Sequence, residues 1–474
     1  MSKLDVRITG ISIENFKNVI SGQVELINTR KAYRTSILGI YGQNGSGKTA
    51  LIDAILLLKY NLCGQRIPPM FADYIQVDAD FAKLRYVFSV KNKECEYEVF
   101  YEFCIKKEED VTGQNSDITT GTKEKYKTVV YDEVISYSYE SKSEKMRKST
   151  LIDTRTDELF LPAPKRECLI GNDKKLKLDL LVTKRVASAS SRSFIFSPEL
   201  INNIRARSNN NHDTEFLRHY QMIESLITYG NFELFVINTA NSGVISMNAL
   251  PLAFKYEKAQ KGAVGNMVIL LDGTSIIPEE MLELVKKVMQ DMNIVLEKIV
   301  PGLTISVKDL GKIVQQDGQV ANRIQLMSHK NNKEIPLKYE SEGIKKIVSI
   351  LQLLIVIYNQ TSITVAIDEL DSGVFEYLLG EILRILSEKG KGQLIFTSHN
   401  LRPLETLDKG FIAFTTTNPK NRYIRMSGVK ENNNLRDFYF RDIVLGEQNE
   451  EVYDYTNNAE IALAFREAGE ISGS

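Results

Sequence analysis

The stretch GQNGSGKT at residues 42–49 decides the fold, because it matches the pattern G-x-x-x-x-G-K-[ST] in full. Glycines at these positions let the backbone curl so that successive N–H groups point at one centre, where they can bind phosphate oxygens. The lysine of such a loop reaches the β- and γ-phosphates of a nucleotide, and the final hydroxyl binds Mg²⁺. The sequence therefore predicts a phosphate-binding loop whose binding residues are Gly42, Asn44, Gly45, Ser46, Gly47, Lys48 and Thr49.

The residues on both sides of this loop have the pattern that such a loop requires. ILGIY at 37–41 is a short, continuous apolar run, typical of a strand buried on both faces. ALIDAILLLKY at 50–60 has apolar residues at helical spacing, and residues 6–16 alternate as a half-buried strand does. Strand, tight loop and helix is therefore the expected local structure.

The second half of a nucleotide site is expected at VAIDE, residues 365–369. Asp368 at the tip of this apolar strand can hold Mg²⁺ and its water shell, and Glu369 can accept a proton from the attacking water. Two acids also mark many ordinary solvated strand ends. Their pairing with the phosphate-binding loop is what favours the functional interpretation.

Two further segments flank this strand in the sequence. Ser341 and Gly343 begin an apolar helix predicted over 343–359, and a hydroxyl with free N–H groups at a helix start can bind an anion. Ser-x-Gly is also an ordinary helix cap. His399 ends the strand predicted at 392–400, where an imidazole could touch a γ-phosphate, although a lone surface histidine is the alternative.

A long insertion separates the two halves of the predicted site. Alternation with a period of two predicts an antiparallel sheet over 81–140, and residues 141–335 have mixed and helical patterns. Strands alternating with helices from about 336 onward favour a largely parallel sheet covered by helices. We therefore predict an ATPase head made of 1–80 and 336–474, interrupted by an insertion over 81–335.

Composition excludes several classes of protein. The 474 residues contain 60 Lys and Arg against 61 Asp and Glu, so no global charge attracts the chain to nucleic acid or to an anionic membrane. Its four cysteines form no C-x-x-C pair, which argues against a disulfide scaffold and a structural zinc site. The first residues lack the apolar core of a secretion signal, and no apolar run could span a bilayer. We expect a cytoplasmic protein without a membrane partner.

Five segments together resemble the ABC-type ATPases of the structural-maintenance-of-chromosomes and overcoming-lysogenization-defect group. They are ISIENFKNV at 11–19, GQNGSGKT at 42–49, YESEGIKK at 339–346, AIDELDSG at 366–373 and FTSHN at 396–400. The resemblance implies an α/β P-loop fold of the ABC-ATPase type, with a β-rich and helical insertion between the phosphate-binding loop and the Asp-Glu strand. That insertion is too short for long coiled-coil arms, so the compact ATPases of bacterial abortive-infection and phage-defence systems are the more similar relatives.

The resemblance also implies cofactors, partners and further site residues. The protein would bind ATP together with Mg²⁺ and hydrolyse the ATP, with Glu369 and His399 as catalytic residues. Ser341 and Gly343 would complete the nucleotide site of a second copy, so that ATP holds a homodimer together. A glutamine after the phosphate-loop helix would link Mg²⁺ to the insertion, and Gln76 is better placed for this than Gln65.

Three functions remain open at this point. The first is an ATP-hydrolysing switch that controls a separate effector, a nuclease or toxin, in anti-phage defence. The second is a DNA-repair or chromosome-associated clamp that binds DNA itself, for which basic clusters at 143–149 and 172–185 are candidate contacts. The third, a scaffold that holds ATP without turnover, is disfavoured by Glu369. Arg207 and His212 match an R-x4-H ribonuclease pattern, but the intervening SNNN favours a solvated polar loop.

Overall fold

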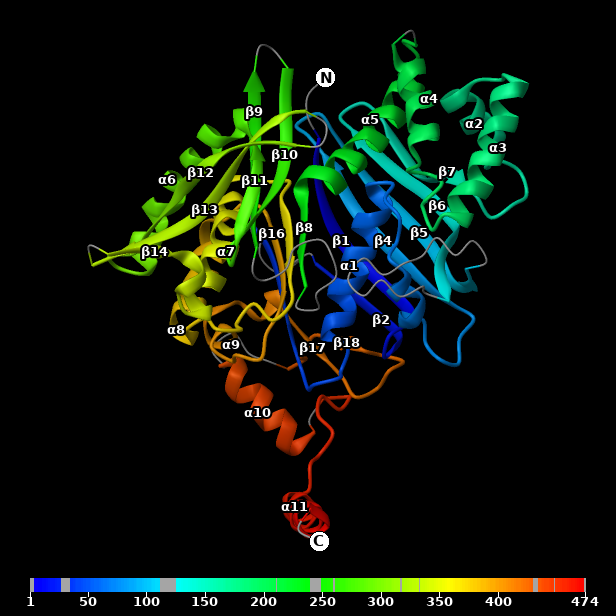
Figure 1. Cartoon of the computed structure of the whole chain (residues 1–474). Coiled ribbons are helices and arrows are strands. Elements are labelled where there is room, and N and C mark those ends of the chain that lie inside the picture. The colour runs from blue at the N-terminus through cyan, green and yellow to red at the C-terminus, as the bar shows by residue number, and fades with distance from the viewer. Residues whose placement is uncertain are drawn as a thin grey trace.

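Two six-stranded β-sheets form the body of the protein, with one helix between them (Figure 1). The structure is a computed structural model. It describes residues 4–26, 35–110, 125–209, 211–238, 249–258, 261–315, 318–331, 333–428, 434–446 and 448–472. Among these residues, no helix has the length and apolar composition that a bilayer crossing needs.

One sheet is parallel except at one edge, where β18 runs antiparallel to β17. Its central strands consist almost entirely of buried residues, because both of its faces are covered. In spatial order its strands are β18 (Tyr423–Ile424), β17 (Ile412–Thr415), β3 (Ser36–Tyr41), β16 (Gln393–Thr397), β15 (Thr364–Ile367) and β8 (Leu234–Ile237).

The other sheet is antiparallel throughout. Buried and part-exposed residues alternate along β4, as expected for a sheet with one face on the core. In spatial order its strands are β2 (Val19–Glu25), β1 (Asp5–Phe16), β4 (Phe81–Lys91), β5 (Cys95–Glu109), β6 (Tyr126–Ser141) and β7 (Lys145–Asp153).

Helix α1 (Lys48–Leu62) fills the space between the two sheets. All but one of its residues are buried, which explains why its sequence is apolar on every side. Its side chains share one hydrophobic core with β1, β4 and one face of the parallel sheet. The opposite face of that sheet packs in a second core with α6 (Leu282–Ile299), α7 (Glu342–Asn359) and α8 (Glu376–Lys389). The phosphate-binding loop at the start of α1 is therefore held from both sides.

Smaller elements surround this body. A helical lobe contains α2 (Ala163–Ile170), α3 (Lys174–Ala189), α4 (Pro198–Ser208) and α5 (Thr214–Thr228), followed by the π-helix η2 (Tyr229–Glu233). A second lobe, on the other side of Figure 1, contains β9 (Ala249–Lys258), β10 (Lys261–Leu270), β11 (Thr274–Pro278), β12 (Thr304–Val314), β13 (Val320–Lys330) and β14 (Lys333–Pro336). Near the C-terminus lie α9 (Pro403–Thr406), α10 (Leu435–Leu445) and α11 (Asn458–Ser472). Short 3-10 turns are η1 (Pro69–Tyr74), η3 (Glu279–Met281), η4 (Leu337–Tyr339) and η5 (Lys409–Phe411).

The α/β P-loop fold predicted from the sequence is confirmed, including the strand, loop and helix around residues 42–49. The antiparallel sheet expected over 81–140 is present as β4, β5 and β6, but it continues into β1, β2 and β7. Conversely β8, which lies inside the predicted insertion, pairs with β15 in the parallel sheet. The boundaries 1–80, 81–335 and 336–474 therefore remain a proposal, with both sheets drawing strands across them.

Candidate nucleotide site

The phosphate-binding loop has the backbone that its glycines allow. Gly42 has φ +151°, and a Cβ there would lie 1.8 Å from the Thr415 hydroxyl oxygen. Gly47 precedes α1 with φ +98°, in the left-handed region that other residues rarely adopt. The Ser46 hydroxyl donates to the Gln43 carbonyl at 2.6 Å, which closes the turn. A side chain at position 42 would therefore force the Thr415 side chain to shift, in a backbone conformation that other residues rarely adopt.

Lys48 lies inside the curl of this loop. Its ammonium donates to the carbonyls of Gly42 at 2.8 Å and Gln43 at 2.9 Å. Burial lowers the pKa of Lys48, and the nearby carboxylates of Asp368, Glu369 and Asp371 oppose that shift. A cation placed here faces a group of acids across a small cavity, which is the arrangement needed to bind phosphate between a lysine and a metal.

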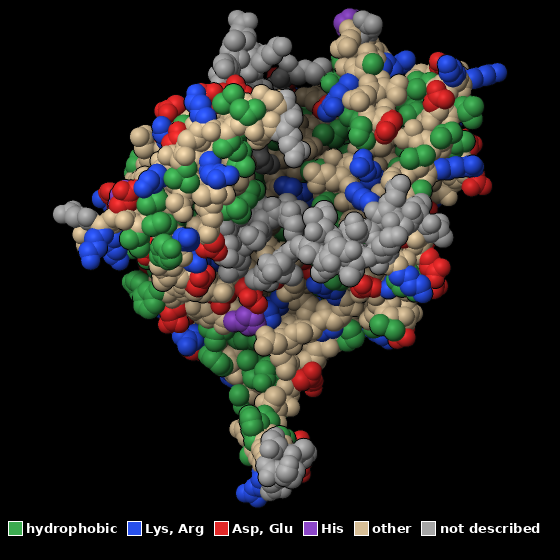
Figure 2. All heavy atoms as spheres, in the orientation of Figure 1, with side chains coloured by type: hydrophobic (Ala, Val, Ile, Leu, Met, Phe, Trp, Pro, Cys, Tyr) green, Lys and Arg blue, Asp and Glu red, His purple; other side chains and the backbone are tan. Residues whose placement is uncertain are grey.

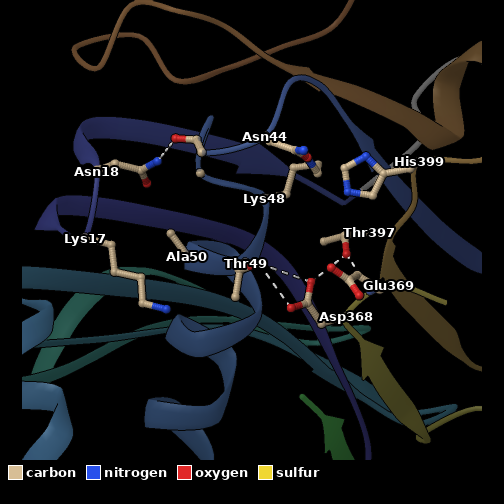
Figure 3. A pocket seen from close by; sticks show the side chains of 12 residues that line it. Lys17, Asn18, Asn44, Lys48, Thr49, Ala50, Asp368, Glu369, Thr397 and His399 are labelled. Atoms are coloured by element: carbon tan, nitrogen blue, oxygen red, sulfur yellow. Dashed lines mark hydrogen bonds between the residues drawn. The ribbon is translucent and has the colours of Figure 1, made fainter. Parts of the chain in front are cut away.

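A chain of hydrogen bonds joins α1 to the tips of β15 and β16 (Figure 3). The Thr49 hydroxyl lies 3.1 Å from Asp368 Oδ2, and Thr397 Oγ1 donates to Asp368 Oδ1 at 2.6 Å. The Glu369 backbone N–H donates to the same Thr397 oxygen at 2.7 Å. The sequence-predicted residues Thr49, Asp368 and Glu369 are thus brought together, and Thr397 is a further member that the sequence did not single out.

These groups surround a cavity of about 320 Å³. Figure 3 shows Lys17 and Asn18 on one side of it, Glu369 and His399 on the other, and Lys48 between them. His399 is held through its backbone, because the N–H groups of His399 and Asn400 donate to Asp371 Oδ2 at 3.1 and 3.0 Å. The predicted residues that line the cavity are Asn44, Gly45, Gly47, Lys48, Thr49, Asp368, Glu369 and His399.

Lys17 and Asn18 are lining residues that the sequence did not identify individually. Lys17 forms an ion pair with the buried Asp53 of α1, and its ammonium lies 4.0 Å from the ring centre of Tyr74. Asn18 donates through its side chain to the Gly45 carbonyl. The segment ISIENFKNV contributed to the resemblance, but only the folded chain places its last polar residues beside the phosphate-binding loop.

Ser341 and Gly343 are not among the residues that line this cavity. Ser341 is exposed and caps α7 by accepting from the Ile344 N–H at 3.4 Å. Gly343 lies against the loop after β15, where a Cβ would be 2.4 Å from the Gly373 carbonyl oxygen. From the next turn of α7, buried Lys346 donates to the Glu369 carbonyl at 3.4 Å. The start of α7 is therefore connected to the Asp-Glu loop without lining the cavity of its own chain.

The structure places the remaining candidates as follows. Gln76 follows η1 and is partly exposed, and its backbone N–H donates to the Asn15 carbonyl at 3.1 Å. Gln76 is not among the residues that line the cavity, so its role as a metal ligand stays a prediction. Arg207 lies in the last turn of α4 rather than in the expected polar loop, because Ser197 caps that helix and Pro198 begins it. The Arg207 guanidinium donates to the Cys168 carbonyl, a structural role.

Residues 7–402 match a family model described as the AAA ATPase domain, which covers most of the chain. No curated protein sequence is significantly similar to it. Among solved structures, an Smc head bound to the C-winged helix domain of ScpA is 12% identical with TM-score 0.37, covering 89% of this chain and 98% of that one. The recombination mediator protein RecF-ATPrS in the RecFOR pathway is 13% identical with TM-score 0.36, covering 89% of this chain and 98% of that one. The SMC head domain from Thermotoga maritima is 15% identical with TM-score 0.35, covering 89% and 99%.

Proposed function

We propose that this chain, which belongs to the AAA ATPase domain family, is an ATP-hydrolysing switch. In this proposal its nucleotide sites are shared between two copies of the chain. One observation supports the chemistry most directly. Lys48, Thr49, Asp368 and Glu369 come from sequence segments more than 300 residues apart, and they converge on one cavity. The hydroxyl–carboxylate chain through Thr397 fixes their relative positions.

The residues of this cavity fit ATP and Mg²⁺. Gly45 and Gly47 line the cavity with positive φ values, the backbone that lets such a loop offer N–H groups to phosphate, and Lys48 supplies a cation for the β- and γ-phosphates. Thr49 and Asp368 would hold Mg²⁺, which neutralises phosphate charge when it is bound. The described residues contain no cluster of three or more acids, histidines or cysteines suited to a metal, so the remaining ligands would be phosphate oxygens and water.

Glu369 and His399 take the catalytic roles in this proposal. Glu369 follows Asp368 directly and lines the cavity, so its carboxylate can accept a proton from the attacking water. His399 lines the same side, and the two hydrogen bonds to Asp371 fix its backbone. Its imidazole would then contact the γ-phosphate and report whether that group is present.

The shared site rests on Ser341 and Gly343. The resemblance assigns these residues to a nucleotide bound mainly by another copy, and their place in the fold supports that assignment. Ser341 is exposed at the start of an 18-residue helix and does not line the cavity of its own chain. Two copies arranged head to tail would each contribute Lys48 and Glu369 to one site and Ser341 to the other. ATP would then stabilise the dimer, and hydrolysis would release it.

Mixing two inactive variants tests the shared site. Lys48→Ala removes the phosphate-binding cation, and Ser341→Arg blocks the surface that would face a second copy. In a mixed dimer one site contains both defects and the other contains none, so ATPase activity should return in part. If neither variant restores activity to the other, and Glu369→Gln stays monomeric with ATP, the shared site is wrong. ATP hydrolysis by the wild-type chain would still test the simpler ATPase proposal.

We further propose that this switch controls a separate effector, a nuclease or toxin, in anti-phage defence. The support is the resemblance to compact phage-defence ATPases. The alternative is a clamp that binds DNA directly. Salt-dependent binding of DNA by the purified protein would favour the clamp, whereas co-purification with a protein encoded next to it would favour the effector.

A further inference from the structure

Helix α3 presents an exposed apolar stripe. Leu178, Val182 and Val186 follow one another at four-residue intervals, so they lie on one face of the helix. Their exposed fractions are 63%, 55% and 57%, whereas only Leu180 and Ala187 of this helix are buried. Three large apolar side chains in a row on a surface helix mark a contact site for another protein.

Positive charge borders this stripe on one side. Lys174 and Arg185 lie along the same edge of the stripe when α3 is viewed down its axis, and neither makes an ion pair with any residue that the structure describes. Two other lysines of this helix do have partners. Lys177 forms an ion pair with Glu167, and Lys184 donates to the carbonyls of residues 156 and 158. The lobe that contains α3 shows apolar and basic side chains side by side in Figure 2. Exposed Asp179 borders the stripe on its other side, so a partner should be apolar with an acidic edge only on the side of Lys174 and Arg185.

Helix α11 has those properties. Ile461, Phe465 and Ala468 lie on one face, and Glu460 and Glu467 border that face on one side. Every residue from 458 to 469 is exposed, with Phe465 at 77%. An isolated helix of 15 residues is marginal in water, so its exposed apolar face calls for a partner.

α11 cannot reach α3 of its own chain. The segment before it is fixed to the body, because Val452 is buried and the Asp454 N–H donates to the side chain of Gln43 at 2.9 Å. α11 therefore begins four residues after a segment that contacts Gln43 of the phosphate-binding loop. In Figure 1 it stands apart at the lower end of the molecule, whereas α3 lies in the lobe at the upper right. Any contact between the two helices must involve two copies.

We propose that α11 of one copy packs antiparallel on α3 of a second copy. The charged edges fix the direction of packing. Viewed from its own N-terminus, each helix has its charged edge on the same side of its apolar stripe. When two such helices face each other, the two charged edges meet only if the helices run antiparallel. Lys174, near the start of α3, then lies beside Glu467, in the second half of α11. The contact uses no residue of the nucleotide cavity, so it forms without nucleotide and does not rest on the proposed function.

Site-specific cross-linking tests the contact on the full-length chain. One sample contains Val182→Cys and the other contains Ile461→Cys, which face each other in this register, and the two are mixed under mild oxidation without nucleotide. A disulfide-linked dimer should form in the mixture and in neither sample alone. Dimers in the Val182→Cys sample alone would mean that α3 pairs with α3, and no dimer in the mixture would mean that the helices do not meet. Either result overturns the proposal.

Charge reversal supplies a second measurement, by sedimentation equilibrium. Lys174→Glu and Glu467→Lys should each weaken self-association several-fold. The mixture of the two variants should restore it, because in a mixed dimer one contact has the reversed charge pair and the other has the native pair. Val182→Glu should weaken it about tenfold or more, because it places an unpaired charge in the apolar stripe. Lys287→Glu and Val77→Glu, at exposed positions elsewhere, are the matched controls. A monomeric wild type, or loss of DNA binding in the α3 variants without any change in mass, would assign this surface to another role and overturn the proposal.

Discussion

Glu369 has a backbone conformation that its neighbours impose. Its φ is +48°, a left-handed value that costs a residue with a side chain about 1–3 kcal/mol. Its N–H donates to Thr397 at 2.7 Å, and its carbonyl accepts from Lys346 at 3.4 Å. Residues from two other elements thus hold the turn after Asp368 in the geometry that points the Glu369 carboxylate into the cavity.

Replacing this carboxylate by an amide should separate binding from hydrolysis. Glu369→Gln keeps the shape and the backbone contacts but removes the proton acceptor, so we expect ATP hydrolysis to slow by about 10²–10⁴-fold with little change in ATP affinity. Steady-state kinetics and equilibrium binding of ATP measure the two effects. Glu388→Gln, at an exposed position on α8, is the control. A wild-type rate in Glu369→Gln would show that another group accepts the proton.

Lys346 should make stability depend on pH in a defined window. Burial lowers the pKa of this amine from 10.5 to about 8, although the carboxylates of Asp371, Glu369 and Asp368 oppose the shift. Between these two values the unfolded chain binds a proton that the folded chain does not, so this group makes the free energy of unfolding rise with pH, by about 3 kcal/mol in all. Below about pH 8 both states are protonated and the contribution is constant.

Lys346→Met removes that contribution. Urea unfolding at pH 8 and at pH 10.5 should show a smaller rise in stability for the variant than for the wild type. Lys389→Met, which removes an exposed amine from the end of α8, should leave the rise unchanged. Equal rises in the wild type and in Lys346→Met would mean that the amine titrates normally in the folded protein.

The sequence could predict the site residues that lie within short patterns. Lys48 and Thr49 belong to one contiguous loop, and Asp368 and Glu369 end one apolar strand, so local rules sufficed. Thr397, Lys346 and Lys17 are in the same site or support it, but each meets its partner only after strands and helices have packed. A threonine in a strand or a lysine in a helix has no local pattern that distinguishes it, and long-range contacts decided these roles.

At the scale of elements, the close approach of α7 to the loop after β15 depends on Gly343. A Cβ at this position would lie 2.4 Å from the Gly373 carbonyl oxygen, which is a backbone atom and cannot rotate away. Gly343→Ala should therefore push α7 and that loop apart, at a cost of about 1–3 kcal/mol in unfolding free energy. ATPase activity should fall as well, because the loop begins at Asp368 and Glu369.

Thermal unfolding and ATPase rates measure these two effects of Gly343→Ala. The control is Gly469→Ala on α11, where a Cβ would meet nothing within 4 Å. There the substitution should leave activity unchanged and stabilise the helix slightly, since alanine favours helices. Normal stability of Gly343→Ala would mean that the loop moves aside without cost.

Elements were predictable where periodicity was strong. The patterns at 37–41, 50–60 and 81–140 correspond to β3, α1 and the strands β4, β5 and β6. β8 was not distinguished, because four apolar residues (Leu234–Ile237) do not reveal whether they form a strand or end a helix. Its pairing with β15, 130 positions later at Thr364↔Leu234, is a long-range choice that no local pattern contains.

For the whole molecule, one buried side chain connects the two sheets. β2 pairs with residues 10–16 of β1, so β2 does not cover the edge of β1 at Ile8. Gln393 of β16 occupies that edge: its carbonyl oxygen accepts from the Ile8 N–H at 2.9 Å, and its amide donates to the Ile8 carbonyl at 2.8 Å. Thr364 of β15 donates to the same glutamine oxygen at 2.9 Å. The amide thus takes the place of a neighbouring strand.

Gln393→Leu should weaken the connection between the sheets. Leucine has a similar size but no polar atoms, so the buried N–H and carbonyl of Ile8 would lose their partners, at about 1–3 kcal/mol for each group. Because these bonds join the antiparallel sheet to the parallel one, calorimetry should show a lower unfolding temperature and a broader transition, as the two sheets begin to unfold separately. Gln65→Leu, at an exposed position after α1, should leave the transition unchanged. A single sharp transition at the wild-type temperature in Gln393→Leu would mean that packing around α1 and the other hydrogen bonds between the sheets, such as Ser36 to the Leu26 carbonyl, are enough to unite them.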